Sequence, residues 1–164
     1  MGDITITNAR SDDPDLLGLI ARHRDFCVAH TPTGSGHAID PEEVSSFAEA
    51  SVPGEDVRYW LARSGEHIVG CIGLRAMDSA HAEIKTLHVL PEARGRRIGE
   101  RLIEKVLNVA KGAGVKRLSL ETGRSDGFAP SRALYAKMNF DPCEPFGAYV
   151  GDPFSYCMSK EIEP

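Results

Sequence analysis

Hydrophobic side chains recur at helical spacing in the longest patterned segment of the chain. After Gly99, apolar residues stand three and four positions apart, with polar residues between them. This spacing is typical of an amphipathic helix with one buried face. Lys111 lies in the expected last turn, and Gly112 and Gly114 follow it, as glycines often do at a helix end. The pattern predicts a helix that begins near Arg96 and buries Leu102, Ile103, Val106, Leu107 and Ala110.

The rest of the chain alternates between strand-like and helix-like patterns and contains no repeats. Asp12 or Asp13 can cap a helix that starts at Pro14 and runs to about Ala29, and a similar signal at Asp40 predicts a second, short helix. The strands on either side of the long helix should be parallel neighbours with a right-handed crossover. The pattern therefore predicts a mixed α/β sheet with helices on both faces. Its expected strands cover residues 4–9, 57–63, 67–75, 83–89, 115–121, 140–143 and 154–160, and a last helix covers residues 130–138.

The start of the long helix carries an unusual concentration of positive charge. Three of the four residues 94–97 are arginines, although the helix dipole disfavours cations at an N-terminus. Backbone N–H groups at a helix start favour phosphate, and Gly95 and Gly99 let the backbone approach a ligand closely. Residues 92–101 carry a charge of +2, whereas the whole chain is −5 and the remainder therefore −7. This asymmetry indicates a local phosphate site and argues against a nucleic-acid partner, which usually needs a basic face.

Composition favours a single soluble domain. With 164 residues, of which 41% are hydrophobic, residues 1–164 suffice for one well-buried core. No apolar run approaches the roughly 18 to 20 residues of a membrane span, and the N-terminus lacks signal-peptide features, so we expect a cytoplasmic protein with no membrane partner. The four cysteines are widely spaced, without a Cys-x-x-Cys pair, and are expected to be reduced thiols. We expect no metal, because Pro32 and Gly34 interrupt any helical face shared by His23, His30 and His37.

Two motifs, in the right order and separated by the right elements, resemble the signatures of a known family. They are Arg94-x-x-x-x-Gly99, after a strand that ends at Val89, and Leu134-Tyr135-x-x-x-Asn139-Phe140 in the last expected helix. Together they resemble the GNAT superfamily of acyl-CoA-dependent N-acetyltransferases over nearly the whole chain. Four further segments are similar to a bacterial subgroup of YsnE-like acetyltransferases. They are residues 37–40, 120–123 and 128–130, and the stretch from Pro145 to Pro153.

Three positions depart from the family pattern. Arg97 stands where the family usually has its first signature glycine, and we expect it to supply a backbone N–H from a helical conformation. Asn139 replaces the glycine before Phe140, and asparagine tolerates a positive φ at a helix end. Phe128 stands where many relatives place an asparagine that contacts pantetheine, so Ser131 or a backbone group is the alternative contact.

The resemblance implies a fold and a cosubstrate. The fold would be GNAT-like, with a central, mostly antiparallel mixed sheet of about seven strands. The cosubstrate would be acetyl-CoA, with its pantetheine arm along the strand segment Leu87, His88 and Val89, where Leu87 and Val89 offer backbone hydrogen bonds. The residues implied to hold the pyrophosphate are Arg94, Gly95, Arg96, Arg97, Ile98 and Gly99.

The implied chemistry needs a neutral amine. A lysine-like amine of pKa about 10.4 is neutral in about 1 molecule in 2,500 at pH 7, which costs about 4.6 kcal/mol. Glu83 matches a position where some GNAT members carry a catalytic glutamate, and we expect it to act through water or with a raised pKa. A strand-end salt bridge with Lys85 or an arginine is its alternative role, and Glu121 is the reserve candidate.

Tyr135 corresponds to a family phenol near the coenzyme A sulfur, and core packing is its alternative role. We expect it to stabilise charge that develops on the sulfur. The segments 31–40 and 145–153 should flank the acceptor, with His37 and Tyr149 as polar candidates. The acceptor would be a primary amine of a small molecule or peptide, and the acidic remainder of the chain favours such a cation.

Two questions remain open at this stage, whether the chain is catalytic and whether it forms a homodimer. A non-catalytic acyl-CoA-binding or regulatory module would keep the arginine-rich turn but would be indifferent to Glu83 and Tyr135. An exposed strand at a sheet edge would allow a homodimer.

Overall fold

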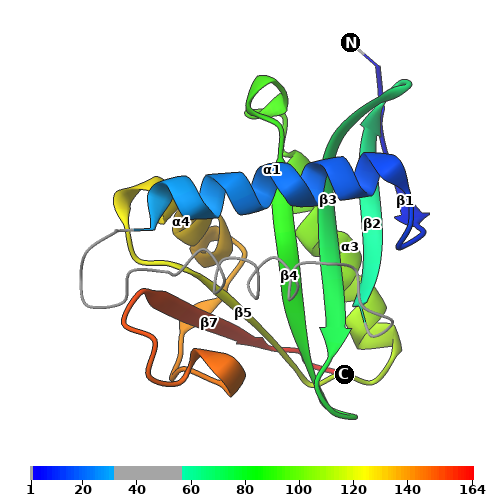
Figure 1. The fold of residues 1–164 in the computed structure, drawn as a ribbon. Coiled ribbons are helices and arrows are strands. Elements are labelled where there is room, and N and C mark those ends of the chain that lie inside the picture. Colours follow the sequence, from blue (N-terminus) through cyan, green and yellow to red (C-terminus); the bar gives the residue numbers. More distant parts are fainter. Residues whose placement is uncertain (1, 32–56) are drawn as a thin grey trace.

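A seven-stranded sheet forms the centre of the computed structural model, which describes residues 2–31 and 57–164 (Figure 1). The strand order is β1-β2-β3-β4-β5-β7-β6, and every neighbouring pair is antiparallel except β4 and β5. The strands are β1 (Ile4–Ala9), β2 (Val57–Ser64), β3 (His67–Ala76), β4 (His81–Val89), β5 (Arg117–Gly123), β6 (Asp141–Pro142) and β7 (Ser155–Glu161). The helices are α1 (Pro14–His30), α3 (Ile98–Gly112) and α4 (Ala129–Lys137), with short 3-10 turns η1 (Pro91–Ala93), η2 (Asp126–Phe128) and η3 (Gly147–Tyr149).

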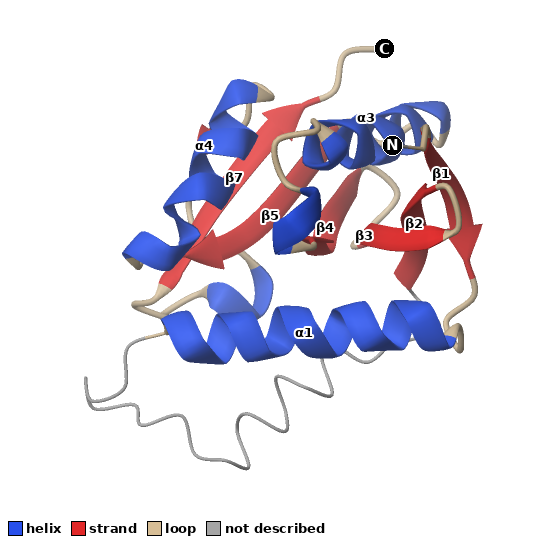
Figure 2. Ribbon diagram, turned by 90° about the horizontal axis from the view of Figure 1, so that it is seen from above, coloured by secondary structure: helices blue, strands red, loops and turns tan. Residues whose placement is uncertain are grey.

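Helices cover both faces of the sheet, as the sequence predicted. Figure 2 shows α1 on one face and α3 and α4 on the other. The face toward α3 holds the larger core, in which Leu102, Ile103 and Val106 are fully buried beside Leu118 and Leu120 of β5. The face toward α1 holds a smaller core, built on Leu16, Leu19 and Ile20. On the same face of the sheet, next to η3, lies a cluster of polar side chains, Glu83, Lys85 and Tyr149, which is described below.

The predicted elements agree closely with the observed ones. The strand at residues 4–9 has the predicted bounds, and β4 and β5 are parallel neighbours joined through α3. The N-terminal end of α3 differs from the prediction, since the helix begins at Ile98 and not near Arg96. The predicted second helix near Asp40 lies outside the described residues. Among the described residues, no helix is both long enough and apolar enough to cross a membrane.

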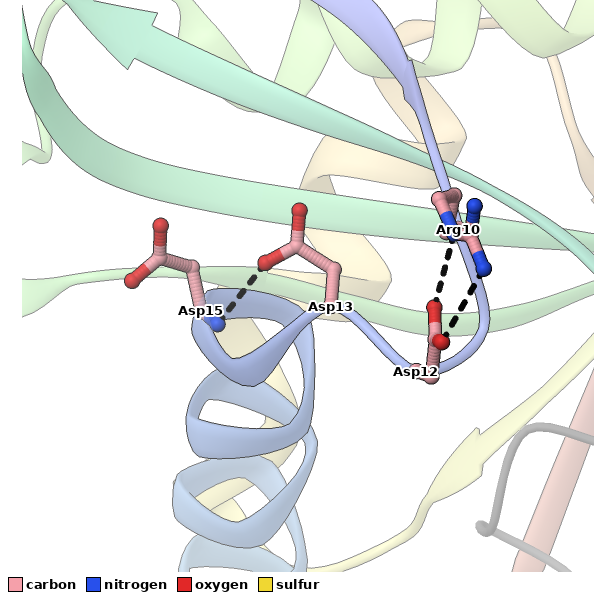
Figure 3. A network of polar contacts seen from close by, with 4 residues as sticks. All are labelled: Arg10, Asp12, Asp13 and Asp15. Carbon is pink, nitrogen blue, oxygen red and sulfur yellow. Dashed lines mark hydrogen bonds and ion pairs between the residues drawn. The ribbon is translucent and has the colours of Figure 1, made fainter.

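The N-terminus of α1 is fixed by one of the two predicted capping residues. The Asp13 carboxylate accepts a 2.9 Å hydrogen bond from the backbone N–H of Asp15, whereas Asp12 forms an ion pair with Arg10 (Figure 3). A side-chain acceptor at this position satisfies a backbone donor that the helix itself leaves without a partner. Asp13 is therefore the N-cap, and Pro14 follows as the first helical residue.

The sheet opens between its two parallel strands. The ladder of β4 and β5 ends at the pair Ile84 and Leu120, although β4 continues to Val89 and stays paired with β3. Within that continuation, Thr86 and Leu87 together oppose the single residue Ile72. This irregularity is a β-bulge, and its residue Thr86 has a φ of 48°. A bulge bends its strand. The last five residues of β4 therefore have no β5 partner along one edge.

Candidate functional site

The loop before α3 contains two residues with left-handed backbone conformations. Gly95 has φ 81° and Arg97 has φ 59°. Left-handed φ values are easy for glycine but strained for a residue with a Cβ atom. The expectation that Arg97 adopts a right-handed helical φ is therefore wrong, because this residue reverses the chain into the helix as its N-cap. Asn139, the other departure from a glycine, has φ 66°, which confirms the expected positive φ.

Each arginine of this loop has a different partner within the chain. Arg97 pairs with Glu100 at 2.7 Å, and Arg96 donates to the Ser64 hydroxyl at 3.2 Å and to the Gly2 carbonyl at 3.1 Å. Arg94 is exposed, and its Nε lies 3.4 Å from the carbonyl of Val89. The guanidinium groups of Arg94 and Arg96 retain donors, since each carries five N–H groups. Part of the negative charge expected among the arginines is thus supplied by the protein itself.

Glu100, in the first turn of α3, is a residue near this loop that the sequence did not single out. Its side chain is buried and pairs with both Arg97 and Lys137, the last residue of α4. The hydrogen bonds from Lys137 and Arg97 lower the pKa of the Glu100 carboxyl. An acidic residue in the first turn of a helix is the sequence signal that could have identified it. Glu100 links the arginine loop to α4.

The two sequence motifs meet at Gly99. A Cβ atom added to Gly99 would lie 2.9 Å from Cδ2 of Leu134 and 4.0 Å from a methyl group of Val89. Gly99 therefore allows α3 to approach α4 and the end of β4 closely. Within the described part of the chain, no side chain caps the first turn of α3. Its first backbone N–H groups consequently remain available as donors at this point.

The end of β4 presents different side chains to the two faces of the sheet. Leu87 and Val89 pack against the larger core. The buried His88 faces α1, where its Nδ1 atom lies 3.4 Å from that of His23, and His23 Nε2 lies 3.5 Å from the Cys27 sulfur. Burial lowers the pKa of His88, and it lowers the pKa of His23 to about 4. Both imidazoles are therefore neutral near pH 7.

Tyr135 lies in the larger core, on α4. Its side chain is 5% exposed, and its ring packs edge-on against Phe140 with centroids 5.6 Å apart. Burial, with a smaller contribution from Glu121, raises the pKa of the Tyr135 hydroxyl above its ordinary value. The phenol therefore stays protonated at any physiological pH. Ser131 stands one turn earlier on the same helix and is half-buried.

Glu83, Lys85 and Tyr149 form a cluster on the face of the sheet toward α1. The Tyr149 hydroxyl donates a 2.6 Å hydrogen bond to Oε1 of Glu83, and Lys85 Nζ donates to the Tyr149 hydroxyl at 3.1 Å. Lys85 Nζ also lies 3.5 Å from Glu83 Oε1. Two candidates predicted from separate segments, Glu83 and Tyr149, are thus in direct contact. The salt bridge with Lys85, which was the alternative role for Glu83, is also present. Burial is the main cause that raises the pKa of Tyr149, and the negative charge of Glu83 is the second.

Glu121, the reserve candidate, lies beside this cluster on β5. Burial is the main cause that raises the pKa of its carboxyl to about 7. The hydrogen bond with Ser155 and the charge of Lys85 oppose this rise, while the charges of Asp152 and Glu83 add to it. Across the β5 and β7 ladder, Glu121 faces Cys157. Two residues before Cys157, the buried hydroxyl of Ser155 lies close enough to the Glu121 carboxyl to lower its pKa.

The remaining predictions concern histidine and cysteine. His37, the other acceptor-site candidate, lies outside the described residues. Within residues 2–31 and 57–164, no group of three or more histidine, cysteine, aspartate or glutamate side chains is arranged to hold a metal ion. All four cysteines are free thiols.

Comparisons with known proteins identify the family and the fold of the chain. The family model described as the acetyltransferase (GNAT) family matches residues 24–140. The uncharacterised N-acetyltransferase YsnE of Bacillus subtilis strain 168 is 32% identical over 147 residues, which cover 90% of this chain and 92% of that protein. An IAA acetyltransferase of Azospirillum brasilense is 37% identical over 164 residues, covering 99% and 100%. The structure of a GNAT family acetyltransferase from Elizabethkingia anophelis with acetyl-CoA bound has a TM-score of 0.67 at 20% identity, covering 99% of this chain and 100% of that one.

Proposed function

The chain belongs to the GNAT family of acetyltransferases, and we propose that it transfers an acetyl group from acetyl-CoA to a primary amine of a small molecule or peptide. The amine attacks the thioester carbonyl directly. One observation carries the proposal: the uncapped start of α3 adjoins the end of β4, whose edge beyond Ile84 has no β5 partner. Phosphate-binding donors and an extended binding edge therefore lie side by side.

The arginine loop suits the pyrophosphate of coenzyme A. The uncapped N–H groups of α3 are donors for phosphate oxygens, and the positive end of the helix dipole adds to their attraction. None of the described residues lies within 4 Å of a Cβ atom placed on Gly95, so the loop backbone is open toward them on that side. Arg94 and Arg96 would add charge-assisted hydrogen bonds. The relative from Elizabethkingia anophelis, which has acetyl-CoA bound, supports this assignment.

The edge of β4 suits the pantetheine arm. Backbone groups of Leu87 and Val89 would hydrogen-bond to its amides, as they would to an added strand. His88 would contribute through its backbone, because its side chain packs against His23 on the α1 face. Ser131, half-buried in the first turn of α4, is the proposed replacement for the asparagine that many relatives use.

Carboxylates on the α1 face would serve the acceptor. Transfer requires a neutral amine, and deprotonating a lysine-like ammonium at pH 7 costs about 4.6 kcal/mol. Glu83 and Glu121 flank the place where β4 and β5 part, so either can receive that proton directly or through water. Tyr149, held on Glu83, would contact the acceptor.

Tyr135 would serve the leaving group. When the C–S bond breaks, negative charge develops on the sulfur of coenzyme A. Since burial keeps the Tyr135 phenol protonated, its role is to donate a hydrogen bond to that sulfur and not to give up its proton completely. The second proton of the attacking amine then neutralises the departing thiolate.

A thiol-release screen tests the proposal. Purified protein is mixed with acetyl-CoA and a panel of amines that spans alkylamines, diamines, amino acids and peptides, and free coenzyme A is measured against reactions without amine. We expect at least one amine to give turnover, with the acetylated product confirmed by mass spectrometry. A non-catalytic acyl-CoA-binding module would bind acetyl-CoA in calorimetry without amine-dependent thiol release, and that result would overturn the proposal.

A further inference from the structure

Glu121 stands at the point where the parallel strands separate. The last β4 and β5 pair joins Ile84 to Leu120, so Glu121 is the first β5 residue beyond the ladder, level with Lys85. We propose that Glu121 is the side chain that accepts the proton of the acceptor's ammonium group. This role rests on the acetyltransferase function proposed above.

Glu83 has a different position in the cluster. One of its oxygens, Oε1, accepts the Tyr149 hydroxyl at 2.6 Å and lies 3.5 Å from Lys85 Nζ, and the side chain is only 4% exposed. These contacts fix the carboxylate and hold Tyr149 and Lys85 beside it. Glu83 is therefore a positioning residue that shapes the acceptor site.

Ser155 lies beside Glu121 on the neighbouring strand. Its residue is 2% exposed, and its hydroxyl lies close enough to the Glu121 carboxyl to lower the pKa of that group. Cys157 lies directly opposite Glu121, and Ser155 is two residues away along β7, so its side chain points to the same face. The hydroxyl can therefore orient the Glu121 carboxylate as it receives the proton.

The groups around Glu121 leave it as the carboxyl suited to exchange a proton at neutral pH. Burial raises its pKa to about 7 against the opposing hydrogen bond of Ser155. Among the described residues, the charged groups that act on it are Glu83 and Lys85 of β4 and Asp152 of the loop before β7. The other titratable groups that face it are protonated at neutral pH, because burial raises the pKa of each. They are Cys27 of α1, Tyr135 of α4, Tyr149 of η3 and Cys157 of β7.

The proton balance of the step is simple. The ammonium gives one proton to the Glu121 carboxylate, and the free amine forms a C–N bond with the thioester carbon. The C–S bond breaks, and the second amine proton passes to the thiolate, which leaves as coenzyme A. Glu121 then returns its proton to water. A carboxyl with a pKa of about 7 accepts a proton from an amine of pKa about 10.4 more readily than one of pKa about 4.3.

The pH dependence of kcat/KM tests this assignment, since it reports the ionisations of the free enzyme and free substrate. The acceptor is the best amine from the thiol-release screen with a pKa above about 9.5, so that its own ionisation lies outside the measured range. For the wild-type protein we expect kcat/KM to rise with pH through a transition near 7. Glu121→Gln should lose this transition and about 100-fold in rate. Glu83→Gln should keep the transition and raise the KM for the amine.

Two matched variants complete the test. His81 lies 2.6 Å from the Ser119 hydroxyl on the same face, and His81→Asn should keep the transition. Glu121→Asp keeps a carboxyl and should keep the pH transition at a reduced rate. This variant replaces Glu121→Gln in the test if the glutamine variant fails to bind acetyl-CoA in calorimetry. A transition that persists in Glu121→Gln, or that disappears in Glu83→Gln or His81→Asn, would overturn the assignment of Glu121 but not the proposed function. Absence of turnover with every amine would overturn the proposed function, and with it this role.

Discussion

Arg97 donates a 2.8 Å hydrogen bond to Glu100, three residues further along α3. The arginine has two local disadvantages, a left-handed backbone conformation and a positive charge at the N-terminal end of a helix. Glu100 counters the second of these, and Lys137 ties Glu100 to α4. The backbone strain has no such compensation.

Replacing Arg97 by glycine should therefore preserve both stability and binding. Glycine adopts φ 59° without a Cβ penalty, which recovers about 1 kcal/mol of backbone strain. The lost ion pair is offset by this gain, because the Arg97 side chain is 73% exposed and the buried Glu100 keeps its second partner, Lys137. Arg97→Ala is the matched control, which loses the pair but keeps the strain. Urea unfolding should rank glycine above alanine by about 1 kcal/mol, with acetyl-CoA affinity unchanged in Arg97→Gly. Equal stability of the two variants would contradict the strain argument.

Gly99→Val should abolish acetyl-CoA binding, but the structure gives two reasons for this outcome. The new side chain would meet Leu134 at 2.9 Å, and it would also cover the N–H groups at the start of α3. Adding Leu134→Ala removes the first effect. We expect the double variant to regain much of the lost thermal stability while binding measured by calorimetry stays absent, with Leu134→Ala alone as the control. Tight binding by the double variant would show that the backbone near Gly99 does not cradle phosphate.

Tyr135→Phe should lower kcat by about 100-fold, the effect typical of losing one hydrogen-bond donor to a developing negative charge. The KM for acetyl-CoA should change little, because the ring keeps its packing against Phe140. Tyr156→Phe is the matched control on β7, where the ring lies under Arg124. Unchanged turnover in Tyr135→Phe would assign this tyrosine to core packing alone.

Glu121→Gln should be more stable than the wild type at pH 8 and equally stable near pH 4. The folded state raises the pKa of this carboxyl from 4.5 to about 7, so folding favours its protonated form. Wild-type stability is therefore lost as the pH rises from about 4.5 to 7, by about 3 kcal/mol. Glutamine mimics the protonated form at every pH and avoids that loss. Thermal unfolding at both pH values measures the difference, and the exposed Glu92→Gln should show none. A stabilisation that is independent of pH would contradict the raised pKa.

Asp13→Ala should destabilise the fold by about 1 kcal/mol, because the variant leaves the N–H of Asp15 without its cap. Asp12→Ala removes only an exposed ion pair with Arg10 and should have no measurable effect on urea unfolding. These neighbouring aspartates differ mainly in this one hydrogen bond. Similar losses in both variants would mean that charge near the helix start, and not capping, is what stabilises α1.

The sequence predicted the features that depend on local patterns. The spacing of apolar residues located α3, and alternation located β1 and β4 to within two residues, because buried faces impose their period on the chain. The strain at Arg97 could not be predicted, since arginine has no preference for positive φ and only the packed loop imposes it. Local pattern also could not predict that Tyr149 would reach Glu83. That contact depends on how η3 folds back over the sheet across 66 positions of sequence.

The separation of β4 from β5 has a consequence for solubility. An unpaired strand edge normally lies at the rim of a sheet, where it invites pairing with strands of other molecules and leads to aggregation. Here the unpaired edge of β4 beyond Ile84 belongs to the fourth of seven strands, with β5, β7 and β6 continuing on that side. Neighbouring strands of the same molecule thus restrict the approach of a foreign chain. The fold can keep a reactive backbone edge available to a ligand without the aggregation hazard that such an edge carries at a rim.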